Sequence, residues 1–576
     1  MLKKVLLLLL LLVCSVSNYA QDLITVFERS GGDSSATYKQ AIDYYKKLAG
    51  KYKNVSINPI GNTDTYYPLH VIFYTQDGNL NIKDWKKEER IIILINNGIH
   101  PGEPDGIDAS MMLLRDAAMG KVKVPKNIVL AVIPVFNIGG ALNRNSFSRA
   151  NQNGPAAYGF RGNAKNLDLN RDFIKMDAKE TQTLIKLFHM LDPDVFIDNH
   201  VSNGADYQHT LSLLSTQHSK LGGEMGAFLH DSFESLIFED MNSRGHDIVP
   251  YVNVWGKTPD NGWPAFIETP RFASGFGALF QTYSFVTETH MLKPFKDRVA
   301  ATYDLMLSFI KVSSEQANKI QTTRKRDRNN IVKAKQLPLD WTLDTTQHDM
   351  VHFDGYEGRY EPSSLSSKPR LFYDRTKPYS KQVPYYNTYN VSRDVTTPKA
   401  YILKQGWENI IEKMRLNGVS VRRVERDTVM ELSVYYIKDY NTTSSPYEGH
   451  YLHSNVTVKK VTRTVKVLRG DYVIKTNQYA KRYIMETLEP QAPDAFFAWG
   501  FFDAVLQQKE HYSSYVFEDV AYQLVKDNEV LRDKYNAMLE ADSTFANNGA
   551  AQLDFIYKNS PYYEETHKQY PVFRVE

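Results

Sequence analysis

An unbroken aliphatic run near residue 91 constrains the fold of this 576-residue chain more than any other stretch. Residues 91–95 read Ile-Ile-Ile-Leu-Ile without polar alternation, which is typical of a strand buried on both faces of a parallel sheet. The run ends at Asn97-Gly98, a helix is expected over about 107–119, and a second apolar run covers 128–136. This order predicts a βαβ unit, and hence an α/β domain whose mostly parallel or mixed sheet is flanked by helices.

Two side chains that can bind a metal ion follow the first of these strands. His100 and Glu103 lie in the turn beyond it, and open α/β sheets place their ligand sites at the carboxyl ends of strands. An imidazole and a carboxylate three residues apart can bind one divalent cation, with zinc as the leading candidate. The pair alone is a weak signal, because a chain with 15 histidines contains roughly one His-x-x-Glu by chance.

Two more predicted strands end in residues of the same chemistry. Residues 194–198 form a short apolar strand before His200, and 283–287 form the last strand of the domain before Glu288. Two histidines and one carboxylate are the ligand set of a catalytic zinc with a position open for water. Glu288 is a candidate to accept a proton from that water and return it to the leaving group. Glu268 competes for this role, although no strand precedes it.

A long polar loop leads into the most informative phrase of the chain. Residues 143–164 have little periodicity, and a loop of that length inside a compact domain is usually functional or disordered. The phrase at its end runs from Arg161 to Phe173 and reads Arg-Gly-Asn-Ala-Lys-Asn-Leu-Asp-Leu-Asn-Arg-Asp-Phe.

With this phrase in place, the order of motifs resembles that of the zinc carboxypeptidase family, the carboxypeptidase A-like metallopeptidases. The shared order is His-x-x-Glu, Arg, Asp-x-Asn-Arg, a His after an apolar strand, and a Glu on the last strand. The resemblance covers about 22–311, and the phrase itself is most similar to bacterial members that trim peptidoglycan peptides. It implies one zinc ion bound by His100, Glu103 and His200.

The resemblance also implies roles for the polar residues around that ion. Asp168 would accept a hydrogen bond from a ligating histidine, Asn170 and Arg171 would bind the terminal carboxylate of the substrate, and Arg161 would stabilise the developing oxyanion. Glu288 would be the general base and acid. Arg149 and Arg144 compete with Arg161. The tyrosine that the family carries on a mobile loop could be Tyr251 or Tyr283.

These roles imply a secreted zinc metallocarboxypeptidase that hydrolyses the C-terminal bond of peptides with a free terminal carboxylate. One alternative is a zinc amidohydrolase acting on peptidoglycan stem peptides or acylated amino acids. Another is a catalytically inactive binding protein of the same fold, which the presence of all three ligands and Glu288 disfavours.

The first twenty residues predict export. Lys3 and Lys4 precede the apolar stretch 5–13, and Ala20 offers a small residue for cleavage, as in a secretory signal peptide. The only cysteine, Cys14, lies inside this segment and is poorly placed for lipidation, so the mature chain has no disulfide and a periplasmic or extracellular location is expected. No later stretch is apolar enough to span a membrane. The net charge of +3 gives no indication of nucleic-acid binding.

The rest of the chain suggests a second domain. We expect the catalytic domain over 21–320, a basic linker over 321–336, and an α+β accessory domain over 337–576. The aromatic cluster at 496–502 is expected in the core of the accessory domain. Within the catalytic domain, the polar stretch 77–90 is expected to be a hairpin or loop.

Overall fold

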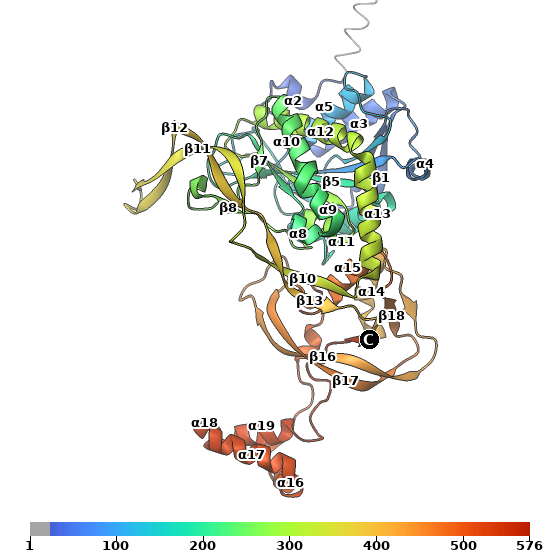
Figure 1. Cartoon of the computed structure of the whole chain (residues 1–576), viewed down its shortest axis with the longest axis vertical. Helices are drawn as coiled ribbons and strands as arrows, with labels where there is room; N and C mark the ends of the chain where they lie inside the picture. The colour runs from blue at the N-terminus through green and yellow to red at the C-terminus, as the bar shows by residue number, and fades with distance from the viewer. Residues whose placement is uncertain (1–22) are drawn as a thin grey trace, which may run out of the picture.

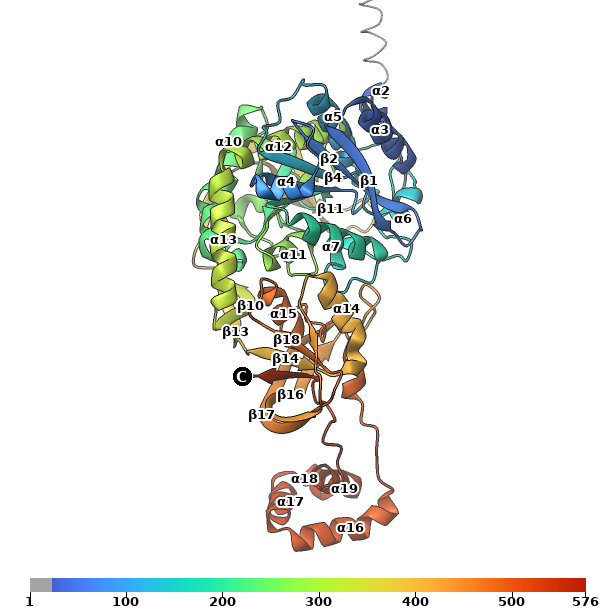
Figure 2. The same ribbon diagram turned by 90° about the vertical axis from the view of Figure 1, so that its right-hand side faces the viewer.

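The computed structural model describes residues 23–576, so the predicted signal peptide lies outside the described residues. A large α/β part, coloured blue to yellow-green, sits above a second part built mainly from strands, and a small group of helices lies at the far end (Figures 1 and 2). Among the described residues, every helix is too short or too polar to cross a lipid bilayer.

The α/β part is organised around an eight-stranded mixed sheet with the strand order β1-β2-β4-β3-β5-β9-β6-β7. Its four central strands, β4, β3, β5 and β9, run parallel, while β2 and β6 flank them in antiparallel pairing. The strands are β1 (Val55–Asn62), β2 (Pro68–Thr75), β3 (Ile91–Asn97), β4 (Ile128–Ile133), β5 (Val195–Ser202), β6 (Leu211–Ser215), β7 (Val249–Pro250) and β9 (Tyr283–His290). This confirms the α/β class with a mixed sheet.

Helices flank this sheet and fix the turn after β3. The main ones are α3 (Tyr38–Lys51), α5 (Asp105–Ala118), α7 (Lys179–Leu191), α11 (Ala273–Leu279) and α12 (Phe295–Glu315). α5 packs against α12 and begins so close to the strands that a Cβ on Gly106 would lie 2.3 Å from Asn97 Oδ1 and 2.5 Å from Asn199 Cβ. A glycine is therefore required where α5 meets the ends of β3 and β5.

The stretch 77–90 is not only a loop, because it contains the helix α4 (Ile82–Lys87). Asn81 caps this helix by accepting a hydrogen bond from the backbone N–H of Lys83. Trp85 is fully buried, with its ring 5.2 Å from that of Phe73. Six residues are too few for a helical period to stand out from the polar sequence, which is why the pattern predicted a hairpin or loop instead.

The basic stretch expected to be a linker is largely helical and partly buried. α13 (Ala317–Lys333) covers most of 321–336. Arg324 is only 5% exposed; it forms an ion pair with Asp194 and another with Asp192 at 3.0 Å. The helix is therefore packed against the α/β part through paired charges, which a count of basic residues does not reveal.

Replacing Arg324 by alanine is expected to lower the free energy of unfolding by about 3 kcal/mol, because the buried Asp194 carboxylate then loses its cation. The matched control is Arg326→Ala on the same helix: its side chain is 63% exposed and pairs with Glu224 on the surface. That change is expected to cost less than about 0.5 kcal/mol. Urea unfolding measures both, and equal effects would contradict the packing role of Arg324.

The second part of the chain is α+β, as expected. Its largest sheet is antiparallel, with the order β15-β18-β14-β19-β16-β17. The strands are β14 (Ala400–Leu403), β15 (Arg422–Arg423), β16 (Thr428–Thr442), β17 (His453–Val467), β18 (Tyr472–Lys475) and β19 (Val572–Val575). The aromatic side chains at 496, 497, 499 and 502 are fully buried, which confirms their place in a core.

Candidate functional site

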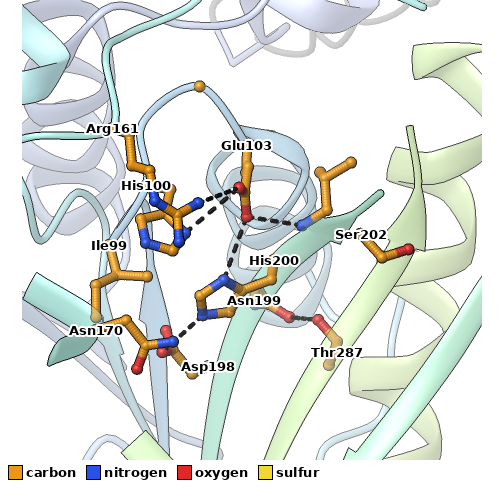
Figure 3. A network of polar contacts seen from close by, with 12 residues as sticks. Ile99, His100, Glu103, Arg161, Asn170, Asp198, Asn199, His200, Ser202 and Thr287 are labelled. Atoms are coloured by element: carbon orange, nitrogen blue, oxygen red, sulfur yellow. Dashed lines mark hydrogen bonds and ion pairs between the residues drawn. The ribbon is translucent and has the colours of Figure 1, made fainter. Parts of the chain in front are cut away.

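Three buried side chains that can hold a metal ion converge at the carboxyl ends of β3 and β5 (Figure 3). His100 and Glu103 come from the turn after β3, and His200 comes from β5. His100 Nδ1 lies 3.4 Å from Glu103 Oε1, and His200 Nδ1 lies 3.2 Å from Glu103 Oε2. Candidate ligand atoms of all three residues lie within 4.8 Å of one another. The fold thus brings together residues that are up to 100 positions apart in the sequence.

Two further carboxylates orient the two imidazoles, one for each ring. Asp168 Oδ1 lies 2.9 Å from His100 Nε2, and Asp198 Oδ2 lies 2.9 Å from His200 Nε2. A carboxylate beside Nε2 favours the proton on that nitrogen and leaves the Nδ1 lone pair facing the centre. His100 Nδ1 is buried without a hydrogen-bond partner among the described residues. An unpartnered nitrogen, a second imidazole and a carboxylate are a donor set that fits a divalent ion such as zinc.

The electrostatics favour positive charge at the centre of this group. Burial raises the pKa of the Glu103 carboxyl, but Arg149 and His100 outweigh it and hold this pKa well below its ordinary value. Burial lowers the pKa of His200, yet the carboxylates of Asp198 and Glu103 hold it well above its ordinary value. A proton or a metal cation can supply the positive charge that these carboxylates favour.

A cavity of about 560 Å³ opens beside the three residues. Its wall combines charged and polar groups with an apolar side. The lining includes Arg149, Arg161, Asn170, Arg171, Tyr251, Glu268 and Glu288, together with Leu214, Trp255, Phe266, Phe272 and Met291. Part of the loop over 143–164 borders this cavity, so its irregular sequence serves to line a site.

Two of the three arginines considered for the oxyanion role lie at the cavity. Arg149 Nη1 lies 2.9 Å from Glu103 Oε1, whereas Arg161 Nη1 lies 3.5 Å from the same oxygen. Arg161 Nε also donates to Asp168 Oδ2 at 2.9 Å, and its side chain is 45% exposed. Arg144 instead donates to the backbone oxygen of Ser35 and does not line the cavity. Arg149 therefore stands beside Arg161 as a second cation at this wall.

Both glutamates considered for the base line the cavity, but in different settings. Glu288 lies on β9 directly opposite His200 in the β5–β9 register. Burial, reinforced by the carboxylates of Glu103 and Glu268, raises the pKa of Glu288 to about 8 against the opposing charge of His200. Glu268 lies in a loop, where its Oε2 accepts a hydrogen bond from the backbone N–H of Ser274. Glu288 is thus the carboxyl group placed beside the candidate ligands.

Arg171 presents free N–H groups to the cavity. Its Nε donates to Tyr447 Oη at 3.0 Å and its Nη1 donates to the backbone oxygen of Asn170 at 2.9 Å. The guanidinium carbon lies 4.2 Å from the centre of the Phe272 ring. Among residues 23–576, Nη2 has no hydrogen-bond partner, so it can meet a planar anion. Asn170 is more constrained, because its Oδ1 accepts a hydrogen bond from the backbone N–H of Ala273.

The structure distinguishes the two candidate tyrosines. Tyr251 lines the cavity, and burial together with the charge of Glu288 raises the pKa of its hydroxyl. Tyr283 is fully buried at the start of β9, where its hydroxyl lies 2.7 Å from Thr323 Oγ1. Of the two, Tyr251 is therefore the one within reach of a molecule in the cavity.

A second group of possible ligands, His209, Asp247 and Asp354, is less suitable for a metal ion. His209 Nδ1 lies 3.1 Å from the backbone oxygen of Asp247, and His209 Nε2 accepts a hydrogen bond from the backbone N–H of Asp354 at 3.0 Å. Both ring nitrogens are therefore already in use.

The sequence pattern missed Asp198 and every contribution from the second part of the chain. Asp198 precedes His200 by two positions on β5, so both side chains leave the strand on the same side, and this spacing was a usable signal. Tyr447 and Glu448 lie more than 270 positions from the residues they contact, and no local sequence pattern predicts these contacts.

The fold and the site define an α/β protein with a candidate metal centre beside an open cavity. No family model matches the sequence. The chain is similar to carboxypeptidase 2 of Trichophyton tonsurans, with 22% identity over 441 residues that cover 71% of this chain and 74% of that protein. Carboxypeptidase 2 of Trichophyton rubrum is 21% identical over 440 residues, with the same coverage. The chain is thus related to the carboxypeptidases, as the resemblance of its motifs to the zinc carboxypeptidase family implied.

The solved structures with detectable similarity to this chain include carboxypeptidases. Carboxypeptidase A from Helicoverpa armigera is 14% identical, covers 50% of this chain and 74% of its own, and gives a TM-score of 0.38. A metallo-carboxypeptidase from Burkholderia cenocepacia is 16% identical, covers 48% of this chain and 69% of its own, and gives a TM-score of 0.35.

Proposed function

We propose that the protein is an exported zinc metallocarboxypeptidase that removes residues from the carboxyl end of peptides. The proposal depends on one observation. The donor set of His100, Glu103 and His200 lines the same cavity as Arg171, which has free N–H groups. Similarity to carboxypeptidases over more than two thirds of the chain supports it. The signal-like sequence of 1–20 supports export.

The proposed roles follow from the chemistry of each side chain. Arg171 binds the terminal carboxylate of the substrate, since two N–H groups of a guanidinium match two carboxylate oxygens. Glu288 accepts a proton from the attacking water and delivers it to the leaving amine. Arg161 and Arg149 place positive charge where the peptide oxygen becomes negative. When bound by His100, Glu103 and His200, zinc supplies Lewis acidity towards the water and the peptide carbonyl.

Mass spectrometry of products from a mixture of peptides and muropeptides tests this function. We expect peptides to shorten one residue at a time from the carboxyl end, while the same peptides with amidated ends stay intact. Release of acyl groups or cleavage inside the chain would instead indicate the amidohydrolase alternative. No product from any substrate, with zinc present, would indicate a binding protein.

Asp198→Asn is expected to weaken zinc binding by about tenfold, because a neutral amide polarises the His200 ring less than a carboxylate does. Competition with a coloured chelator measures the affinity. Asp247→Asn is the control: that residue belongs to the second group, and we expect unchanged zinc binding. A weaker affinity for the control alone would place the ion at His209 instead.

A further inference from the structure

A loop from the second part of the chain contacts Arg171, one of the residues that line the candidate site. This loop, residues 443–452, connects β16 to β17. At its tip, the backbone N–H groups of Tyr447 and His450 each donate to the other residue's carbonyl, at 2.7 and 3.1 Å. Glu448 and Gly449 between them both have positive φ, 51° and 83°, as in a tight two-residue hairpin. The tip is therefore a defined turn.

Three contacts join this tip to residues 168–177, the segment that carries Asp168, Asn170 and Arg171. Tyr447 Oη accepts a hydrogen bond from Arg171 Nε at 3.0 Å. Glu448 Oε2 accepts one from the backbone N–H of Asp168 at 2.7 Å. His450 Nε2 lies 2.7 Å from Asp177 Oδ2. The loop thus contacts both ends of 168–177.

The ring of Tyr447 is itself held in place. It stacks on Trp499, with ring centres 6.1 Å apart and planes 22° apart. The Arg271 guanidinium carbon lies 4.9 Å from the centre of the Trp499 ring, and Arg271 Nε donates to Asp494 Oδ1 at 2.7 Å. The hydroxyl that meets Arg171 is therefore attached to a fixed ring, and it can restrict the orientation of the guanidinium.

Glu448 acts on the turn rather than on a side chain. It is a non-glycine residue in the left-handed region, which is unfavourable by itself. Its carboxylate binds the backbone of Asp168, the residue whose side chain contacts His100 Nε2 and accepts from the backbone N–H of Asn170. The unusual conformation thus places an acceptor at the start of the 168–171 turn.

We propose that Tyr447 and Glu448 are positioning residues, through which the second part of the chain sets the orientation of Arg171 and of the 168–171 turn. The loop over 443–452 then supports the carboxylate-binding residues without lining the cavity itself, and the α/β part alone lacks this support. This inference rests on the proposed function, since it assigns Arg171 to the terminal carboxylate of the substrate.

Tyr447→Phe tests the proposal, because it removes only the hydroxyl and keeps the ring on Trp499. For peptides with a free terminal carboxylate, we expect KM to rise roughly tenfold with kcat changed by less than about twofold. Calorimetry with N-acetylphenylalanine, which carries the same carboxylate, should show the same loss of affinity. In an Arg171→Ala background, Tyr447→Phe should have no further effect.

The control is Tyr451→Phe, a change in the same loop at a side chain that is 51% exposed; we expect KM and ligand affinity to stay at wild-type values. Additive effects of Tyr447→Phe and Arg171→Ala, or a lower melting temperature with KM and ligand affinity unchanged, would overturn the positioning role and leave the proposed function intact. A wild-type protein that releases no terminal residue from any peptide would refute the proposed function, and the inference with it.

Glu448 is tested with a graded pair of variants. Glu448→Gln keeps an oxygen that can accept from the Asp168 N–H, so ligand affinity should stay within about threefold of wild type. Glu448→Ala removes the acceptor and should weaken N-acetylphenylalanine binding by roughly tenfold. Equal affinities for the two variants would overturn the role assigned to Glu448.

Discussion

His200→Ala is expected to reduce the release of C-terminal residues by about 10³-fold or more and to abolish stoichiometric zinc binding. The change removes one of three donors and leaves the Asp198 carboxylate beside an empty space, so the remaining two ligands hold the ion weakly. Treating the wild-type protein with a chelator should cause the same loss of activity. Added zinc should restore the chelated wild type but not the variant. Metal analysis by mass spectrometry, alongside a peptide assay, measures both effects.

The control for this experiment is His348→Ala, a change at an exposed histidine outside the cavity lining. It should keep one zinc ion and wild-type activity. Undiminished activity in His200→Ala, or in the chelated wild type, would exclude the proposed metal centre as the source of catalysis.

Glu288→Gln is expected to lower kcat by about 10³-fold while zinc content stays at one ion per chain. Glutamine has nearly the same shape as glutamate but cannot take a proton from water at neutral pH. Because Glu288 lies opposite His200, the proton acceptor that this change removes lies beside the candidate zinc ligands. Single-turnover measurements with a saturating peptide separate this chemical step from binding.

The discriminating control is Glu268→Gln. Glu268 also lines the cavity, but its carboxylate caps the backbone N–H of Ser274, so we expect an effect on kcat of less than about threefold. A large loss in Glu268→Gln together with a fully active Glu288→Gln would transfer the role of base to Glu268.

The centre of the sheet could be predicted because β3 and β4 contain uninterrupted runs of apolar residues. Burial on both faces removes polar alternation from β3 and β4, and the next polar residues then mark the ends of strands. The short helix α4 and the packed helix α13 were harder to predict. α4 depends on a single cap and one buried tryptophan, and α13 carries charges whose partners, Asp192 and Asp194, lie far away in the sequence.

The residues of the candidate site also fall into two groups, those that the local sequence indicates and those that it does not. His100, Glu103, His200 and Glu288 lie at or just beyond the ends of apolar strand patterns, so the local sequence is enough to indicate them. Asp198 becomes a candidate only when its alternation with His200 on one strand is considered. The contacts of Tyr447 and Glu448 depend on how two parts of the chain pack together, and residue types alone contain no such information.

The position of a bound metal ion is the sharpest test of the proposed metal centre. Crystals of the zinc-loaded protein should give one strong anomalous peak at the zinc absorption edge, at about 2.0–2.2 Å from His100 Nδ1, His200 Nδ1 and a Glu103 carboxylate oxygen. A peak at another place, or none between these three side chains, would contradict zinc binding by His100, Glu103 and His200.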